Sequence, residues 1–157
     1  MAARPCGTAL YLRLRSDRAA IPASRPCRVA IGFTSRGAKG KAIGECWDNR
    51  RIGDGHFEIF IRPDLAHAPD AMPAQIAAIL AHELVHAAVG IAAGHGRAFK
   101  RVSVGLGLVG PMRATTPGDA FLSAIAPILA AVGPLPVSYT HLTLPTRDLV
   151  SILVVAR

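Results

Sequence analysis

Residues 73–96 read PAQIAAILAHELVHAAVGIAAGHG, and this stretch decides the fold. It begins with Pro73, which suits the first turn of a helix. It continues as an apolar run rich in alanine, the residue with the highest helix propensity. Gly90 and Gly94 then offer positions where the helix can end and the chain can turn back. We therefore predict a helix that begins near Pro73 and ends near Gly90, followed by a tight return.

Two histidines and one glutamate lie within this predicted helix. His82 and His86 are four residues apart, so their side chains leave the same helix face about one turn apart. That spacing suits one tetrahedral Zn²⁺ with ligand nitrogens at about 2.0–2.1 Å. Glu83 lies beside them, where its carboxylate can act as a general base. The alternative is a solvated helix face, but unpaired polar groups would be costly within so apolar a run.

A third ligand is expected further along the chain. His95 follows His86 by nine residues, whereas the compact zinc hydrolases place their third histidine six residues after the second. Classes of zinc hydrolase whose third metal ligand is a glutamate from a later helix are excluded, because no glutamate follows Glu83. Asp119 is the only acidic residue between Glu83 and residue 137, and it remains the alternative to His95. A site with three protein ligands keeps its fourth position open, as hydrolytic zinc sites do.

Between about residues 28 and 136, roughly two thirds of the chain, the sequence resembles the SprT-like zinc metalloprotease domain, particularly its small phage and bacterial members. The similarity lies in a paired HExxH and GHGxxF pattern and in two strand-like segments before it. The matching segments are GKAIGECW at 40–47, EIFIRP at 58–63, HELVHA at 82–87 and GHGRAFKRV at 94–102.

This resemblance implies a zincin-like domain that hydrolyses peptide bonds with one Zn²⁺. It implies His82, His86 and His95 as the metal ligands and Glu83 as the general base. Because better-studied relatives cut proteins bound to DNA, it also raises the expectation of a DNA-bound protein substrate. Two other functions stay open, a non-catalytic zinc-stabilised binding module and a nucleic-acid-associated adaptor.

The two ends of the chain are expected to lie outside the domain. Residues 137–146 read VSYTHLTLPT, which one reading frame of a common transposase sequencing adapter encodes, so we expect 137–157 to be an artefactual tail. Its histidine, His141, is therefore not a ligand candidate. Residues 1–26 are expected to be either a poorly ordered arm or the product of a miscalled start. The domain itself is assigned to residues 27–136.

Without its two ends, the chain has a much smaller net charge, which gives less support to nucleic-acid binding. The whole chain carries +8, which invites a nucleic-acid interpretation. Residues 1–26 contribute +4 and 137–157 contribute +1, so the 110-residue domain carries only +3. Basic residues could still meet phosphate from two places, although a solvated basic surface is the favoured interpretation. These residues are Arg36, Lys39 and Lys41 in a loop, and Arg97, Lys100 and Arg101 after His95.

Cysteine content and hydropathy favour a cytoplasmic protein. Cys6, Cys27 and Cys46 form no CxxC pair and no even framework, which favours reduced thiols. We find no secretory signal and no stretch of the length that a membrane span needs. The length and the predicted elements favour a single small α+β domain.

The expected order of elements is three strands and then three helices. The strands are residues 28–34, 41–47 and 56–62, with a turn at 35–40 and with Phe57, Ile59 and Ile61 on the buried face of the third. They should form a small antiparallel or mixed sheet packed on the metal-binding helix. Residues 64–72 are expected to be a loop. Two further helices are predicted at about 97–106 and 118–132, the second with a possible kink at Pro127.

Three further features concern the site and the chain after it. The strand at 56–62 is predicted to align an extended peptide substrate by pairing with its main chain. Arg62, His67 and Arg97 remain candidates for stabilising the oxyanion, each with a structural or surface role as the favoured interpretation. Residues 105–110 match GxGxxG, but they follow a predicted helix and run into Pro111, which indicates a helix exit rather than a dinucleotide site.

Overall fold

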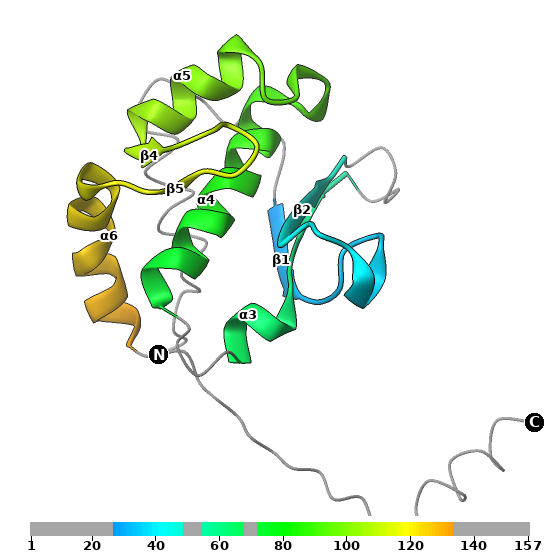
Figure 1. Ribbon diagram of the computed structural model, residues 1–157, viewed down its shortest axis with the longest axis horizontal. Coiled ribbons are helices and arrows are strands. Elements are labelled where there is room, and N and C mark those ends of the chain that lie inside the picture. The colour runs from blue at the N-terminus through cyan, green and yellow to red at the C-terminus, as the bar shows by residue number, and fades with distance from the viewer. Residues whose placement is uncertain (1–26, 49–54, 68–71, 134–157) are drawn as a thin grey trace, which may run out of the picture.

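The computed structural model describes residues 27–48, 55–67 and 72–133 (Figure 1). Both predicted end segments, 1–26 and 137–157, lie outside these residues. The described part is α+β, with a three-stranded sheet, four α-helices and a short two-stranded hairpin. The α+β class expected from the sequence is therefore confirmed.

The sheet consists of β1 (Cys27–Ile31), β2 (Gly44–Trp47) and β3 (Phe57–Ile61), in the order β1-β3-β2. β1 runs parallel to β3 and β2 runs antiparallel to it, so the sheet is mixed. All three predicted strands form, each shorter than expected. The connection between β1 and β2 does not close a hairpin, because β3 lies between these two strands.

The central position of β3 overturns one prediction. We expected residues 56–62 to offer a free edge to a peptide, but both edges of β3 are already paired, with β1 and with β2. The alternation of residues along this strand correctly predicted its buried face, because Phe57, Ile59 and Ile61 are at most 2% exposed. A periodicity of two identifies the face that is buried and says nothing about which strands lie alongside.

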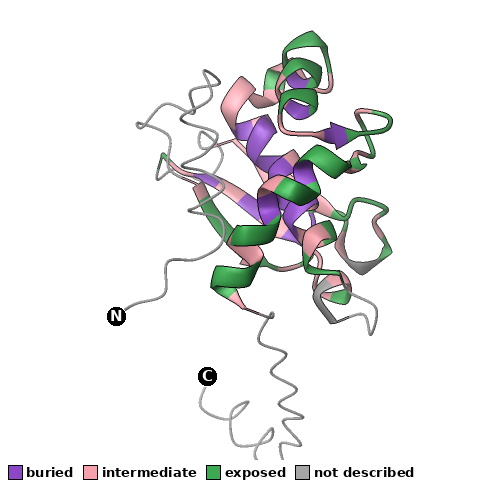
Figure 2. Ribbon diagram, turned by 90° about the vertical axis from the view of Figure 1, so that its left-hand side faces the viewer, coloured by how far each residue is buried: buried purple, intermediate pink, exposed green. Residues whose placement is uncertain are grey.

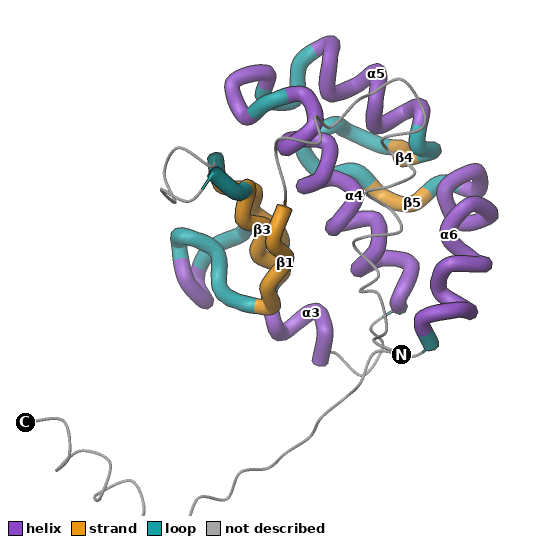
Figure 3. The backbone as a smooth tube through the Cα atoms, turned by 180° about the vertical axis from the view of Figure 1, so that it is seen from behind, coloured by secondary structure: helices purple, strands orange, loops and turns teal. Residues whose placement is uncertain are grey.

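Helix α4 (Pro73–Val89) is the centre of the fold, with the sheet on one side and α5 (Arg97–Gly105) and α6 (Asp119–Val132) on the other (Figures 1 and 3). It begins with Pro73 at its first turn, as predicted. Its alanines let neighbouring elements pack closely, and the purple segments of Figure 2 show how much of it is buried. The buried residues of α4 are Ala77, Ala78, Leu80, Ala81, Glu83, Leu84, Val85 and Ala87.

A short helix, α3 (Pro63–His67), occupies part of the predicted loop, so the loop prediction is wrong for residues 64–67. Proline fixes the backbone angle needed at a helix start, and Asp64 adds a negative charge to the first turn. Arg62 donates to both Asp64 carboxylate oxygens, at 2.9 and 2.6 Å, and to the Gly40 carbonyl at 2.6 Å. These bonds tie the end of β3 to the loop before β2.

After α5 the chain forms a hairpin of two very short strands, β4 (Leu108–Val109) and β5 (Thr116–Pro117), which sequence periodicity did not indicate. The GxGxxG match at 105–110 falls at the end of α5 and in this hairpin, so its interpretation as a helix exit is confirmed. Helix α6 then continues across Pro127 to Val132. Within the described ranges, no helix has both the length and the apolar character that crossing a membrane requires.

Candidate metal centre

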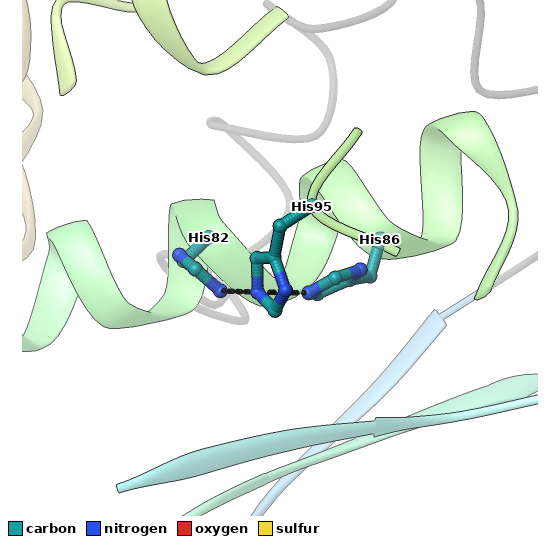
Figure 4. A group of neighbouring side chains, drawn as sticks. All are labelled: His82, His86 and His95. Atoms are coloured by element: carbon teal, nitrogen blue, oxygen red, sulfur yellow. Dashed lines mark hydrogen bonds between the residues drawn. The ribbon is translucent and has the colours of Figure 1, made fainter. Parts of the chain in front are cut away.

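Three histidine side chains converge on one point above α4 (Figure 4). His82 and His86 project from the same face of the helix, one turn apart, and His95 enters from the chain that follows it. The Nε2 atom of His95 lies 3.2 Å from Nε2 of His82 and 3.2 Å from Nε2 of His86. The structure thus brings together the three residues predicted as ligands.

The spacing of these nitrogens fits a shared cation. An imidazole nitrogen carries either one hydrogen or one lone pair, so the Nε2 of His95 cannot make two good hydrogen bonds at once. Ligands at 2.0–2.1 Å from a tetrahedral zinc would have nitrogens roughly 3.3 Å apart. The two observed separations of 3.2 Å are close to this value. A neutral set of three imidazoles is a donor set that suits zinc.

The return of the chain from α4 to His95 depends on two glycines, as predicted. The Gly90 N–H donates to the His86 carbonyl at 2.9 Å and closes the helix, with φ at +88°. A single 3-10 turn, η2 (Ile91–Ala93), follows and ends at Gly94, with φ at +49°. Residues that have a Cβ rarely adopt such φ angles. The nine-residue spacing between the second and third histidines therefore spans the last residues of α4 and this turn.

Phe99 packs against all three histidine rings. Its ring is fully buried, and its centroid lies 4.8, 4.5 and 4.9 Å from those of His82, His86 and His95. It is carried by α5, which begins directly after Gly96. The phenylalanine of the GHGxxF pattern is thus part of the site as a packing surface. Its position limits the directions in which the three imidazoles can turn.

Glu83 is buried beside the three histidines, close to Gly44 of β2. A Cβ placed on Gly44 would lie 2.7 Å from Glu83 Oε1 and 2.9 Å from Ile79 Cγ2, so a larger residue here would displace these side chains. Burial, and secondarily the charge of Glu45, raises the pKa of Glu83 to about 8. Glu45 is itself held in place, because its carboxylate accepts hydrogen bonds from the N–H and the hydroxyl of Ser35 at 2.6 and 2.7 Å.

Burial has the opposite effect on the histidines. It lowers the pKa of His82 and of His86 to about 4, and the neighbouring imidazoles add to the effect. The pKa of His95 is also lowered, by burial and then by the charge of Arg113. All three imidazoles are therefore neutral at physiological pH. This is the form that binds a metal.

The metal-free protein is expected to be most stable near pH 6.5. Unfolded histidines take up protons near pH 6.5 but folded His82 and His86 only near pH 4, so stability falls as pH drops through this window. Folded Glu83 keeps its proton up to about pH 8 but the unfolded one loses it near 4.5, so stability also falls as pH rises to 8. Below pH 6.5 the stability lost through the two histidines exceeds the stability gained through the one glutamate. Urea midpoints of chelator-treated protein at pH 5, 6.5 and 8.5 test this, and a highest midpoint at pH 8.5 would contradict it.

A groove of about 400 Å³ lies over the histidines. One wall is residues 41–46, which lead into and form most of β2, and the other is residues 113–115 at the tip of the β4–β5 hairpin. A second hollow of about 690 Å³ shares Glu45, Cys46 and Ile91 with the first and follows β2 to Asp48. Between them, the two hollows are lined by all four residues of β2. Among the described residues no strand pairs with the outer edge of β2.

Arg113 is the arginine that lines this groove, and the sequence analysis missed it. Of the earlier candidates for the oxyanion, Arg62 is engaged by Asp64 and Gly40, and Arg97 is exposed at the start of α5, outside the groove lining. The side chain of His67 lies outside the described residues. The alternative ligand Asp119 begins α6 and does not belong to the histidine cluster.

The free cysteines of the described ranges play no part in the cluster. Cys46 is on β2 and packs against the core as expected, and burial raises its pKa. Burial also raises the pKa of Cys27, to about 11. Both thiols are therefore protonated and unreactive at neutral pH. Cys6 lies outside the described residues.

No protein-family model matches the chain, and comparisons with curated proteins and with solved structures also give no match.

Proposed function

We propose that this protein is a zinc-dependent peptidase of the zincin type, with His82, His86 and His95 as the ligands of one Zn²⁺. The observation that carries the proposal is the convergence of three neutral imidazoles at the floor of a groove, next to a buried carboxylate. A purely structural zinc site is closed by four protein ligands, whereas the described cluster offers three. When bound, the ion would act as a Lewis acid towards a carbonyl and lower the pKa of water.

Glu83 would move the proton in this reaction. Its carboxylate, held between Ile79 and the backbone of Gly44, would take a proton from the attacking water and deliver it to the amine leaving group. The raised pKa of about 8 describes the metal-free protein; a nearby divalent cation favours the charged carboxylate. The burial that raises this pKa also makes Glu83 a better proton acceptor once it is charged.

The substrate would be an extended peptide aligned on β2. Among the described residues no strand pairs with the outer edge of β2, which lines the groove, so a peptide can add there as a further strand. The role that we assigned to residues 56–62 thus passes to the neighbouring strand. A peptide placed there would run between β2 and the hairpin tip, over the histidines.

Arg113 is the residue that we propose to stabilise the negative charge developing on the scissile carbonyl oxygen. It lines the groove on the wall opposite β2, and its charge lowers the pKa of His95. No described carboxylate forms an ion pair with it. Its guanidinium can therefore turn towards a substrate.

Membership of the SprT-like family belongs to the same proposal. It is supported by the HExxH and GHGxxF segments, whose histidines and phenylalanine meet in one cluster. A DNA-bound protein as the natural substrate, and a cytoplasmic location, follow from that resemblance and from the sequence. The six basic residues that could meet DNA are all exposed: Arg36, Lys39, Lys41, Arg97, Lys100 and Arg101.

Metal analysis and a cleavage assay together test the function. We expect one zinc per chain and slow cleavage of casein or histone, lost on chelation and restored by zinc. Zinc without any cleavage would favour the non-catalytic binding module. A chain that binds no zinc would overturn the proposal, and salt-dependent DNA affinity without cleavage would favour the adaptor.

A further inference from the structure

We infer that Thr115 is a positioning residue that fixes the ring of His82 for metal binding. The Thr115 hydroxyl oxygen lies 2.9 Å from Nδ1 of His82, although the two residues are 33 apart in the chain. Both side chains are half-buried. The inference rests on the proposed zinc site, because it assigns a function to the contact between Thr115 and one of its ligands.

The chemistry of imidazole explains why this contact matters. A neutral histidine carries its hydrogen on one ring nitrogen and a lone pair on the other. If Nδ1–H of His82 donates to the Thr115 oxygen, then Nε2 presents its lone pair to the point where the three ligands meet. Metal-binding histidines usually have such an outer partner, which sets both the tautomer and the orientation of the ring.

The hairpin that carries Thr115 is closely packed against the rest of the domain. At its base the Gly118 N–H donates to the Gly107 carbonyl at 3.0 Å, and at its tip the Ala114 N–H donates to the Pro111 carbonyl at 2.8 Å. Gly107, with φ at +85°, approaches α6 so closely that a Cβ would lie 2.5 Å from the Phe121 nitrogen. Backbone contacts thus place the Thr115 hydroxyl, which sits on a short side chain.

The other two ligands have no equivalent partner in the described part of the chain. The Nδ1 atom of His86 is buried without a hydrogen bond. Within the described residues, the ring of His95 comes within hydrogen-bond distance only of the other two rings, through its Nε2. Thr115 is therefore the one outer contact through which the described protein sets the tautomer of a ligand. Losing it should weaken the site measurably.

Exchanging Thr115 for valine tests this inference, since valine keeps the shape and removes the oxygen. In competition with a chromophoric chelator, we expect Thr115→Val to raise the Kd for zinc by roughly 10- to 100-fold. Thr115→Ser, which restores the oxygen, should stay within a few-fold of the parent. Thr116→Val changes the next residue, which is exposed, and should leave the Kd unchanged.

Nitrogen NMR of the histidine side chains gives a readout that packing alone would not move. In metal-free protein, His82 should be mainly the Nδ1–H tautomer, and this share should fall in Thr115→Val but not in Thr115→Ser. Equal zinc affinity for Thr115→Val and the parent, or a serine variant as weak as the valine one, would overturn the inference. The NMR measurement needs neither zinc nor cleavage, so failure of the peptidase proposal would remain distinguishable from failure of this one.

Discussion

Replacing Glu83 with glutamine is expected to lower peptide hydrolysis by roughly a hundred- to ten-thousand-fold, the usual contribution of a general base. Glutamine keeps the size of the side chain, so it fits the narrow space against Gly44 and Ile79. It cannot take up the proton of the attacking water. The three imidazoles are unchanged, so zinc content should stay at one per chain. Two quantities are measured. The first is kcat/KM on a peptide that spans the cleavage site of the best protein substrate. The second is zinc content, by metal analysis.

The chain offers a matched control for this variant. Glu58 is a half-buried glutamate on β3 that does not line the groove. Glu58→Gln makes the same chemical change and should leave both hydrolysis and zinc unaltered. Two outcomes would contradict the assignment of Glu83: full activity in Glu83→Gln, or equal losses in the two variants.

Replacing Phe99 with alanine is expected to weaken both the fold and the metal site. Truncating a buried phenylalanine costs about 3–5 kcal/mol of the free energy of unfolding. Here the lost ring also contacts all three ligands, with centroids 4.5 to 4.9 Å away. The imidazoles would gain freedom to turn, so the Kd for zinc should rise as well. Urea unfolding and chelator competition measure the two effects separately.

Phe121→Ala separates the metal effect from general destabilisation. Phe121 is also buried, at 2% exposure, but it belongs to α6 and the apolar core. We expect a similar loss of stability with a much smaller change in zinc affinity. Phe99→Leu, a milder change, serves if the alanine variant does not fold. Equal changes in zinc affinity for Phe99 and Phe121 variants at matched stability would contradict the supporting role of Phe99.

The local parts of the site could be predicted from the sequence, because they depend on helix geometry and on short turns. A four-residue spacing places His82 and His86 together in any helix, and Gly90 and Gly94 indicate where the chain returns. The convergence of His95 with them followed from this reasoning and from the family resemblance. The buried face of β3 was predicted for the same reason, since alternation is a local property.

Other features depend on contacts between distant segments, and the sequence analysis missed them. The order of the strands places β3 in the centre, and no periodicity within 56–62 could indicate that. Thr115 and Arg113 reach the site only because a hairpin of two-residue strands folds back over α4. Arg113, Thr115 and Thr116 match no sequence motif that would indicate a functional site. The single useful signal was the run of glycines at 105, 107 and 110, which marked a turn without showing where it leads.

The small side chains of α4 have a consequence for how the domain would take up the proposed zinc ion. Alanines at 77, 78 and 81 pack in the core with residues of the sheet and of α6, so apolar packing fixes the helix that bears His82 and His86. Zinc fingers, by contrast, collapse only when their ion arrives. A domain assembled in this way loses little conformational entropy when it takes up zinc. We therefore expect cycles of loss and reloading of the proposed zinc ion to leave the architecture intact.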